Sequence, residues 1–336
     1  MIYYFLIFLL NIGIIFFLNN YFSNSIIFDN NYDKPQSAHS KKTLKIGGFL
    51  ILLNLIFLTY LLNISLELSF YFILSLFLIL GFLGDFNFKP LVRLILMVMA
   101  IILTLFLLPL SIEKITFIIF DINFNYNKVI LFIFTFLCIL VVINGINFID
   151  SNNGNIILFS IIVIFVMYYL NNDSFLNLIL LLFLQLFILI LLLNFPNSYT
   201  FMGDNGSIII GFILSYLAIS FNNLNTDQDY HSAIVVILLI YPAFEVFFSI
   251  IRKYIEGTNP MKADGLHLHN ILFKKMSHYF NEYHSNYLTS ILINSVILIN
   301  IIVAILFFID FSYLILYSLF MIIQYLIFYF ILRKII

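Results

Sequence analysis

The chain has 336 residues, of which 63% are hydrophobic and 9% are charged, and its formal net charge is −1. Soluble domains are about 45–50% apolar and about 25% charged, so a soluble fold could not bury this much apolar surface. Lipid must therefore be the solvent, and the near-neutral charge gives no broad basic field for nucleic acid. Cys138 is the only cysteine, so an intrachain disulfide is excluded.

Apolar runs of membrane-spanning length follow one another along the chain. A helix needs about 20 apolar residues to cross the hydrocarbon core. The pattern predicts an all-α polytopic membrane protein, a single domain over residues 1–336, with spans at 2–19, 46–63, 66–83, 91–110, 129–149, 155–170, 174–195, 206–221, 232–251, 288–309 and 311–332. The first run lacks a basic segment and a small-residue cleavage site, so we interpret it as a retained span.

Lysine and arginine predict the orientation of these eleven spans. With the N-terminus outside, the outer loops hold Lys114 and Lys128, and the inner loops hold the other thirteen of the 15 basic residues. The thirteen are Lys34, Lys41, Lys42, Lys45, Lys89, Arg93, Arg252, Lys253, Lys262, Lys274, Lys275, Arg333 and Lys334. Because basic residues concentrate in cytoplasmic loops, we expect an external N-terminus and a cytoplasmic C-terminus.

Five polar clusters interrupt the apolar runs, and all five fall on the predicted cytoplasmic side. They cover residues 33–48, 84–90, 144–155, 201–207 and 259–270. The centres of the spans are almost free of ionisable residues, whereas channels and transporters often place such residues at mid-membrane. We therefore expect an active site on the cytoplasmic face.

The first cluster, "DKPQSAHSKKTLKIGG", places His39 and four lysines, Lys45 among them, before a pair of glycines. Basic residues at the start of a span often only satisfy the orientation rule. They can also hold an anionic lipid headgroup or nucleotide phosphates. The sequence leaves both interpretations open.

Asp85, Asp150 and Asp204 each lie at the cytoplasmic end of a predicted span, beside glycine or asparagine. Such carboxylates can be solvated, can cap helices, or can converge on a cation. Three at the same depth favour a cation, and hard oxygen ligands suit Mg²⁺, which binds through one or two carboxylates plus substrate phosphates and water. The helix expected to start near Asp204 also predicts free backbone N–H donors for an anion.

The motif "HLH" places His267 and His269 near Asp264, in a predicted large cytoplasmic loop over residues 252–287. Zinc is one interpretation, although H-x-H without a third His or Cys nearby is a weak zinc pattern. Donation to a pyrophosphate is another, and ordinary packing or solvation is the third. Taken together, the clusters predict Mg²⁺-assisted phosphate chemistry at the inner membrane surface, with one soluble and one lipid-borne substrate.

Five blocks, in this order, resemble the polyprenyl-phosphate N-acetylhexosamine-1-phosphate transferases of glycosyltransferase family 4. "FMGDNGS" (201–207) matches that family's F-M-G-D-x-G-S, its most specific block. The other four are "TLKIGG" (43–48), similar to T-P-R-x-G-G; "GFLGDFNFKPLVRL" (81–94), similar to G-x-x-D-D followed by K-x-R-L; "NGINFIDSNNG" (144–154), similar to N-x-x-N-x-x-D-G-x-D-G; and "PAFEVFFSIIRK" with "NPMKADGLHLHN" (242–253 and 259–270), similar to P-x-x-D and R-R followed by D-R-x-H-x-H-H.

The resemblance implies transfer of a sugar 1-phosphate from a UDP-N-acetylhexosamine to undecaprenyl phosphate, giving the undecaprenyl-diphospho-sugar and UMP. The expected location is the bacterial cytoplasmic membrane. The expected role is the first step of a cell-surface glycan such as O-antigen, capsule or another cell-wall polymer. UDP-N-acetylglucosamine is the commonest donor in that family. The resemblance also implies Mg²⁺, with Mn²⁺ as the alternative cation, and makes a homodimer a candidate assembly.

The resemblance also implies roles for individual residues. Asp204 and Asp85 are the expected metal ligands, with Asp85 also acting at the lipid phosphate, and Phe201 would stack on uracil. The expected catalytic residues are Asp85, Asp150, Asp204, Asp264, His267 and His269. The expected substrate-binding residues are Lys45, Asn144, Asn147, Phe201, Gly203 and Arg252.

The chain departs from the family pattern at four positions. Gly84, Asn153 and Gly265 stand where charged residues are expected, and Glu245 replaces an aspartate. These changes keep two alternatives open: a catalytically impaired relative that binds lipid phosphate or UDP-sugar, and a transporter of lipid-linked sugars. The joint presence of the six expected catalytic residues favours an active transferase.

Overall fold

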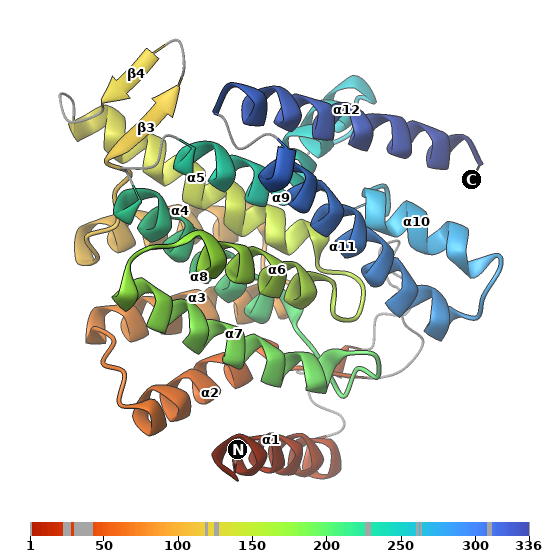
Figure 1. The fold of residues 1–336 in the computed structure, drawn as a ribbon. Helices are drawn as coiled ribbons and strands as arrows, with labels where there is room; N and C mark the ends of the chain where they lie inside the picture. The colour runs from red at the N-terminus through yellow and green to blue at the C-terminus, as the bar shows by residue number, and fades with distance from the viewer. Residues whose placement is uncertain are drawn as a thin grey trace.

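The computed structural model describes residues 2–22, 28–29, 43–117, 120–123, 128–225, 230–259, 262, 264–307 and 311–335. Lys34, His39, Lys41 and Lys42 of the first polar cluster lie outside this set. The described chain is almost entirely helical, and its long helices run side by side (Figure 1). They are α1 (Ile2–Tyr21), α2 (Gly47–Leu62), α3 (Leu68–Asp85), α4 (Pro90–Leu107), α5 (Lys128–Ile149), α6 (Asn155–Leu170), α7 (Ser174–Asn194), α8 (Gly203–Leu224), α9 (His231–Ile255), α11 (Glu282–Phe307) and α12 (Phe311–Ile335).

Within the described residues, nine of these helices are long and apolar enough to cross a membrane, and α2 and α6 are shorter apolar helices. Many large apolar side chains point outward, among them Leu68 and Phe106, which are 84% and 75% exposed. Such a surface suits lipid rather than water. The prediction of an all-α polytopic membrane protein is confirmed, whereas the number of spans and their orientation stay predictions.

The predicted loop over residues 252–287 differs most from the structure. Helix α9 continues to Ile255 and α11 already begins at Glu282, so Arg252 lies on a helix. A short helix that the sequence did not predict, α10 (Leu268–Ser277), occupies much of the remaining segment. Lys274 and Lys275 lie in the last turn of α10 and make this helix too polar to span a membrane. Basic residues at that end also complement the helix dipole.

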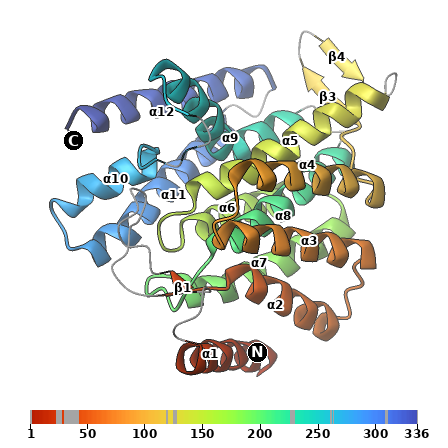
Figure 2. The same cartoon turned by 180° about the vertical axis from the view of Figure 1, so that it is seen from behind.

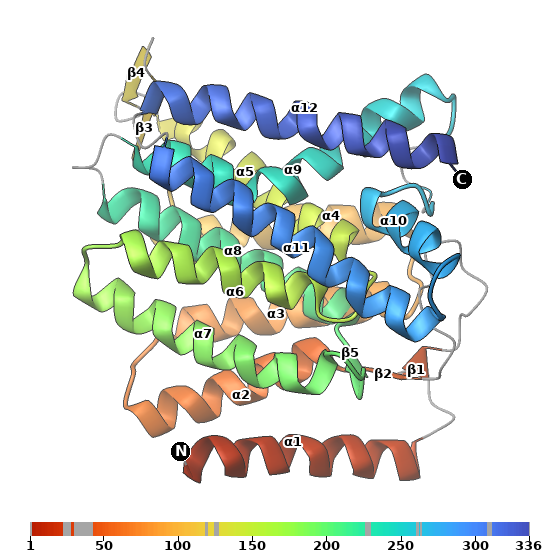
Figure 3. The same cartoon turned by 45° about the vertical axis from the view of Figure 1, so that its right-hand side comes forward.

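Each end of the helix bundle carries its own small sheet, of three strands at one end and of two at the other. At one end, β1 (Phe28–Asp29), β2 (Thr43–Lys45) and β5 (Thr200–Phe201) form a sheet of order β1-β2-β5, antiparallel between β1 and β2 and parallel between β2 and β5. Helix α10 lies at this same end, and the hairpin of β3 (Lys114–Phe117) and β4 (Phe120–Asn123) lies at the other (Figures 2 and 3). The two termini also lie at opposite ends (Figure 3).

Helix α8 is the centre of the bundle and is buried along most of its length. It packs against α2, α3 and α5. Its first turn approaches α3 so closely that a Cβ on Gly81 would lie 2.2 Å from the Cα of Asn205. Glycine at this position lets the start of α8 reach the end of α3, and the polar residues that the sequence singled out lie at this junction.

Candidate active site

The "FMGDNGS" block forms the entry into α8. Strand β5 ends at Phe201, and the chain turns at Gly203, whose φ is +64°. Glycine adopts this left-handed conformation without steric cost. A Cβ here would also lie 2.8 Å from Oδ1 of Asp85. Gly203 thus allows both the turn and the approach of the Asp85 carboxylate.

Asp85, the last residue of α3, caps the N-terminus of α8. Its Oδ1 accepts the backbone N–H of Asp204 (3.1 Å), and its Oδ2 accepts the backbone N–H and the side-chain amide of Asn205 (3.1 and 2.7 Å). A carboxylate at a helix N-terminus satisfies unpaired N–H groups and complements the helix dipole. The prediction of free backbone N–H donors at the start of α8 is therefore wrong for Asp204 and Asn205, because the Asp85 carboxylate already accepts both N–H groups.

Asp204 itself lies in the first turn of α8 and is partly open to the outside. Arg93 from α4 pairs with Oδ2 of Asp204 at 2.9 Å, and the Asp204 side chain is 30% exposed. Asn147 from α5 donates to its Oδ1 at 3.2 Å and to the hydroxyl of Ser207 at 2.8 Å. Three helices thus fix one carboxylate that remains accessible to a ligand.

Asn205 ties this junction to the sheet and to α2. Its side-chain amide donates to the carbonyl of Lys45 at 3.0 Å, and its Oδ1 accepts the backbone N–H of Gly48 at 2.7 Å. Lys45 lies opposite Phe201 in the parallel pair of β2 and β5, and Phe201 is half-buried. The structure therefore brings together predicted site residues that are more than 150 positions apart in the chain.

Asp150 follows the end of α5 and is half-buried. Burial, and then the nearby carboxylates of Asp204 and Asp85, raise the pKa of Asp150 well above its usual value, and Lys45 opposes this shift. The three predicted aspartates are thus close enough to affect one another electrostatically.

A complete metal cage is not formed by protein side chains alone. Among the described residues, no group of three or more His, Cys, Asp or Glu side chains is placed to hold a metal ion. The donor set instead fits a cation that takes one or two carboxylates from the protein and the rest of its ligands from phosphate and water, as Mg²⁺ commonly does. The predicted substrate-binding Asn144 donates its amide to the Leu140 carbonyl on its own helix at 2.7 Å and to the Met97 sulfur on α4 at 3.5 Å.

A second cluster joins α9 to the segment before α10. The Arg252 guanidinium contacts both carboxylate oxygens of Asp264, at 3.0 and 3.2 Å, and Glu256 at 3.3 Å. Burial favours a raised pKa for Asp264, but the backbone N–H of Leu266 and the Arg252 guanidinium outweigh it and hold the pKa below its usual range. The predicted catalytic Asp264 and the predicted substrate-binding Arg252 thus bind each other.

Replacing Arg252 with Ala should lower the free energy of unfolding by about 2 kcal/mol, because Asp264 and Glu256 would lose a buried partner. The double variant Arg252→Met/Asp264→Leu should recover part of this loss, since no Asp264 carboxylate would then be left without its Arg252 partner. Thermal unfolding in detergent measures both. Equal losses for the single and double variants would contradict a direct coupling of the two side chains.

The two predicted histidines lie beside a buried acid on α9. His267 Nδ1 lies 2.9 Å from Glu245 Oε2, and the His267 and His269 rings stack with centroids 5.6 Å apart. His267 is 8% exposed, whereas His269 is wholly buried and both its ring nitrogens lack a hydrogen-bond partner. In this structure His269 therefore has no path to a soluble ligand without movement of the chain around it.

Burial lowers the pKa of His269 to about 3, with Glu245 opposing the shift and His267 adding to it. In the unfolded chain His269 binds a proton below about pH 6.5, so between pH 6.5 and 3 the unfolded state holds more protons and stability falls as the pH falls. From pH 7.5 to pH 5 this loss is about 2 kcal/mol.

His269→Leu should remove that part of the acid sensitivity in thermal unfolding. The matched variant His278→Gln, at an exposed position, should keep the wild-type pH dependence. An unchanged acid sensitivity in His269→Leu would mean that other groups cause it.

Sequence reasoning did not assign site roles to three residues. Arg93 and Asn205 contact Asp204 or Asp85 directly, and Glu245 orients His267. Arg93 and Asn205 both lie inside family-like blocks, so the blocks were a usable signal. Only the fold shows which carboxylate each of them contacts.

Comparisons with known proteins cover the part of the chain that forms the start of α8. The family model described as "Glycosyl transferase family 4" matches residues 67–222, which include Asp85, Asn147, Asp150 and Asp204. An undecaprenyl-phosphate alpha-N-acetylglucosaminyl 1-phosphate transferase of Thermotoga maritima is 29% identical over 83 residues, 25% of this chain and 26% of that protein. A decaprenyl-phosphate N-acetylglucosaminephosphotransferase of Mycolicibacterium smegmatis is 28% identical over 91 residues, 24% of this chain and 22% of that protein.

These alignments span about a quarter of each relative's length, and the family match leaves out the second cluster around Asp264. The matched region nevertheless contains the junction of α3, α4, α5 and α8 that holds Asp204. The chain is accordingly similar to glycosyl transferase family 4 over residues 67–222, and it is a multi-pass membrane protein.

Proposed function

We propose that this protein transfers a sugar 1-phosphate from a UDP-N-acetylhexosamine to undecaprenyl phosphate, giving an undecaprenyl-diphospho-sugar and UMP. The product would start a cell-surface glycan at the bacterial cytoplasmic membrane. The observation that carries the proposal is the convergence of Asp85, Asp204, Arg93 and Asn147 at the start of α8, inside the family match. The names of the two relatives support a polyprenyl-phosphate acceptor and an N-acetylglucosamine phosphate donor.

In the proposed reaction an oxygen of the lipid phosphate forms a bond to the β-phosphorus of the UDP-sugar. The bond from that phosphorus to the oxygen bridging the α- and β-phosphates breaks, and UMP leaves with that oxygen. A phosphate nucleophile needs little deprotonation near pH 7, so positioning and charge neutralisation matter more than a strong base. Arg93 and Lys45 supply cationic charge beside the carboxylates.

A divalent cation fits this site as a proposal. Asp204 and Asp85 would hold Mg²⁺, or Mn²⁺ in its place, and each retains unoccupied lone pairs beyond its present hydrogen bonds. When bound, the ion would neutralise charge on the diphosphate. Asn147 and Arg93 orient the Asp204 carboxylate, and Asp85 fixes the helix end that carries it.

The test measures UMP release from purified protein supplied with undecaprenyl phosphate, Mg²⁺ and a panel of UDP-N-acetylhexosamines. We expect release with at least one donor, dependent on both the lipid phosphate and the divalent cation. Absence of release with every donor would refute the transferase. Reactions that lack undecaprenyl phosphate provide the control for donor hydrolysis.

A catalytically impaired binding protein is the second candidate, and Asn153 motivates it. An aspartate is expected at this position, but Asn153 donates its side-chain amide to the Pro196 carbonyl at 3.2 Å, and its backbone N–H donates to Asn286 at 2.7 Å. The residue thus serves a structural contact that an aspartate could not make. This candidate predicts calorimetric binding of UDP-sugar without UMP release.

A further inference from the structure

Buried polar side chains gather where α12 packs against α9 and α10 (Figure 1). On α9 they recur every four residues, at positions 241, 245 and 249, and therefore share one face of that helix. We call this set the Glu245 cluster, and its members are Tyr241, Glu245 and Ser249 of α9, His269 of α10 and Tyr325 of α12. Each member is at most 8% exposed.

The Glu245 carboxylate is the centre of this cluster. Tyr241, Tyr325 and His269 all interact electrostatically with it, and the ring centroids of Tyr241 and Tyr325 are 6.4 Å apart. Helices α9 and α12 are both long and apolar enough to cross a membrane. An ionisable group within such a helix is costly unless polar groups pair with it, so the carboxylate needs partners from within the protein.

The cluster contains more polar atoms than the described part of the chain satisfies. The hydroxyls of Tyr241 and Ser249 and both ring nitrogens of His269 are buried and have no hydrogen-bond partner among the described residues. Unpaired polar groups are costly wherever they are buried, and lipid offers them neither a donor nor an acceptor. A further polar partner is therefore required at this place.

Glu245 also retains bonding capacity. Its Oε2 lies 2.9 Å from Nδ1 of His267, and its Oε1 accepts the backbone N–H of Leu268 at 3.2 Å. A carboxylate offers about four lone-pair sites, so about two of them remain for other donors. The same small ligand could therefore donate to Glu245 and bond to the neighbouring hydroxyls and ring nitrogens.

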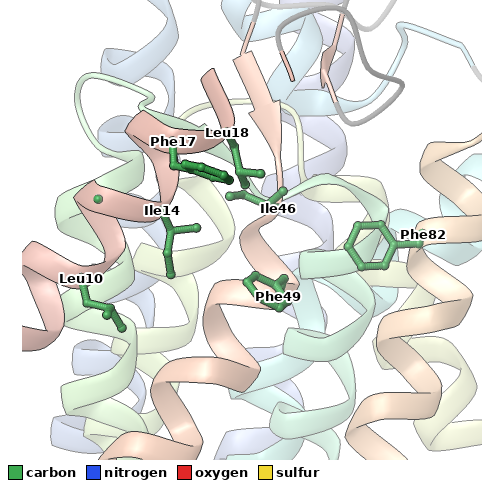
Figure 4. A pocket seen from close by; sticks show the side chains of 8 residues that line it. Leu10, Ile14, Phe17, Leu18, Ile46, Phe49 and Phe82 are labelled. Atoms are coloured by element: carbon green, nitrogen blue, oxygen red, sulfur yellow. The ribbon is translucent and has the colours of Figure 1, made fainter. Parts of the chain in front are cut away.

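An apolar groove elsewhere in the molecule has the opposite character. It lies between α1 and the neighbouring ends of α2 and α3 (Figure 4). Its described lining, which includes Ile14, Phe49 and Phe82, contains no polar side chain. Apolar cavities stay free of ordered water, whereas buried water occupies sites that offer it two to four polar partners. The Glu245 cluster offers such partners, and the groove does not.

We propose that the Glu245 cluster is a binding site for ordered water, which bridges the Glu245 carboxylate to the Tyr241 and Ser249 hydroxyls and to His269. A buried water molecule makes about three hydrogen bonds, so about two molecules would satisfy the unpaired atoms and the remaining lone pairs of Glu245. The water completes the solvation of the carboxylate that holds His267. The proposal is independent of the proposed transferase activity.

Tyr241→Phe distinguishes a hydrated cluster from a dry one by the sign of its effect on stability. If water bonds the hydroxyl, its removal loses a hydrogen bond, and we expect the apparent melting temperature in detergent to fall by about 2 °C. If the hydroxyl is buried dry and unpaired, phenylalanine removes its desolvation cost and the melting temperature rises. A rise or an unchanged value would overturn the proposal. Tyr279→Phe, at a position that is 70% exposed, is the matched control and should melt as the wild type does.

A second test uses the wild-type protein and needs no turnover. Radiolysis of protein equilibrated in ¹⁸O-water generates hydroxyl radicals from bound water, and these oxidise the adjacent side chains. We expect ¹⁸O label on Tyr241 and Tyr325 despite their burial. Phe77 and Phe212, stacked with centroids 4.9 Å apart in the buried contact between α3 and α8, are the dry controls and should stay unlabelled. Unlabelled tyrosines, or equal labelling of the two phenylalanines, would refute a specific water site.

Discussion

Asp204→Asn should reduce UMP release by about 100- to 1,000-fold, the range expected when one preorganised electrostatic group is removed from an active site. Asparagine has nearly the same shape, so the contact with Asn147 and the start of α8 should persist. The substitution removes the negative charge that pairs with Arg93 and that would hold the cation. Initial rates at saturating donor and acceptor, over a range of Mg²⁺ concentrations, measure the effect.

Asp173→Asn is the matched control. Asp173 caps α7, where its Oδ1 accepts the backbone N–H of Leu176 at 2.7 Å, and asparagine is an equally good N-cap. The same chemical change there should leave both activity and apparent melting temperature at wild-type values. Full activity of Asp204→Asn, with normal folding, would exclude the proposed role of Asp204 at the metal.

Gly84→Ala should reduce activity by about 100-fold although it adds a single methyl group. A Cβ at this position would lie 2.2 Å from Oδ2 of Asp204, the oxygen that pairs with Arg93. The carboxylate must therefore move, and a displacement of about 1 Å at a reacting centre can cost about 100-fold in rate. Alanine favours a helix by about 1 kcal/mol over glycine, so α3 itself is not weakened.

Ile79→Ala on the same helix is the control for this prediction. Ile79 is 58% exposed on the outer face of α3, and its replacement should not alter the rate. Gly84→Asp, which restores the residue that the family pattern places there, should be at least as damaging as Gly84→Ala in this chain. A gain of activity in Gly84→Asp would show that Asp204 can adopt a second position with room for both carboxylates.

The Gly84 contact also gives a physical interpretation of the departure from the family pattern. The space that a side chain at position 84 would occupy is taken by the Asp204 carboxylate, and Arg93 compensates the charge of that carboxylate. The absence of a carboxylate at position 84 thus goes together with the close packing of the Asp204 carboxylate against Gly84.

Hydropathy along the chain determined most of the fold. An apolar run of about 20 residues can satisfy its backbone in lipid only as a helix, so composition and run length were enough to place α1 to α9 and α12 within four residues and α11 within six. Helix α10 was missed because it is short, amphipathic and lies between spans, where hydropathy gives no signal. The position of Asp85, Asp150 and Asp204 at the cytoplasmic ends of predicted spans identified them as one group, and the family-like blocks contain all three.

Only the tertiary structure decided what each of these side chains contacts. The pairing of Asp85 with the first N–H groups of α8, of Arg252 with Asp264, and of Arg93 with Asp204 joins residues from different parts of the chain. Residue spacing within one helix sets which face a side chain occupies, but not which neighbouring helix lies against that face. The burial of His269 depends on how separate helices pack, and local sequence carries no record of that packing.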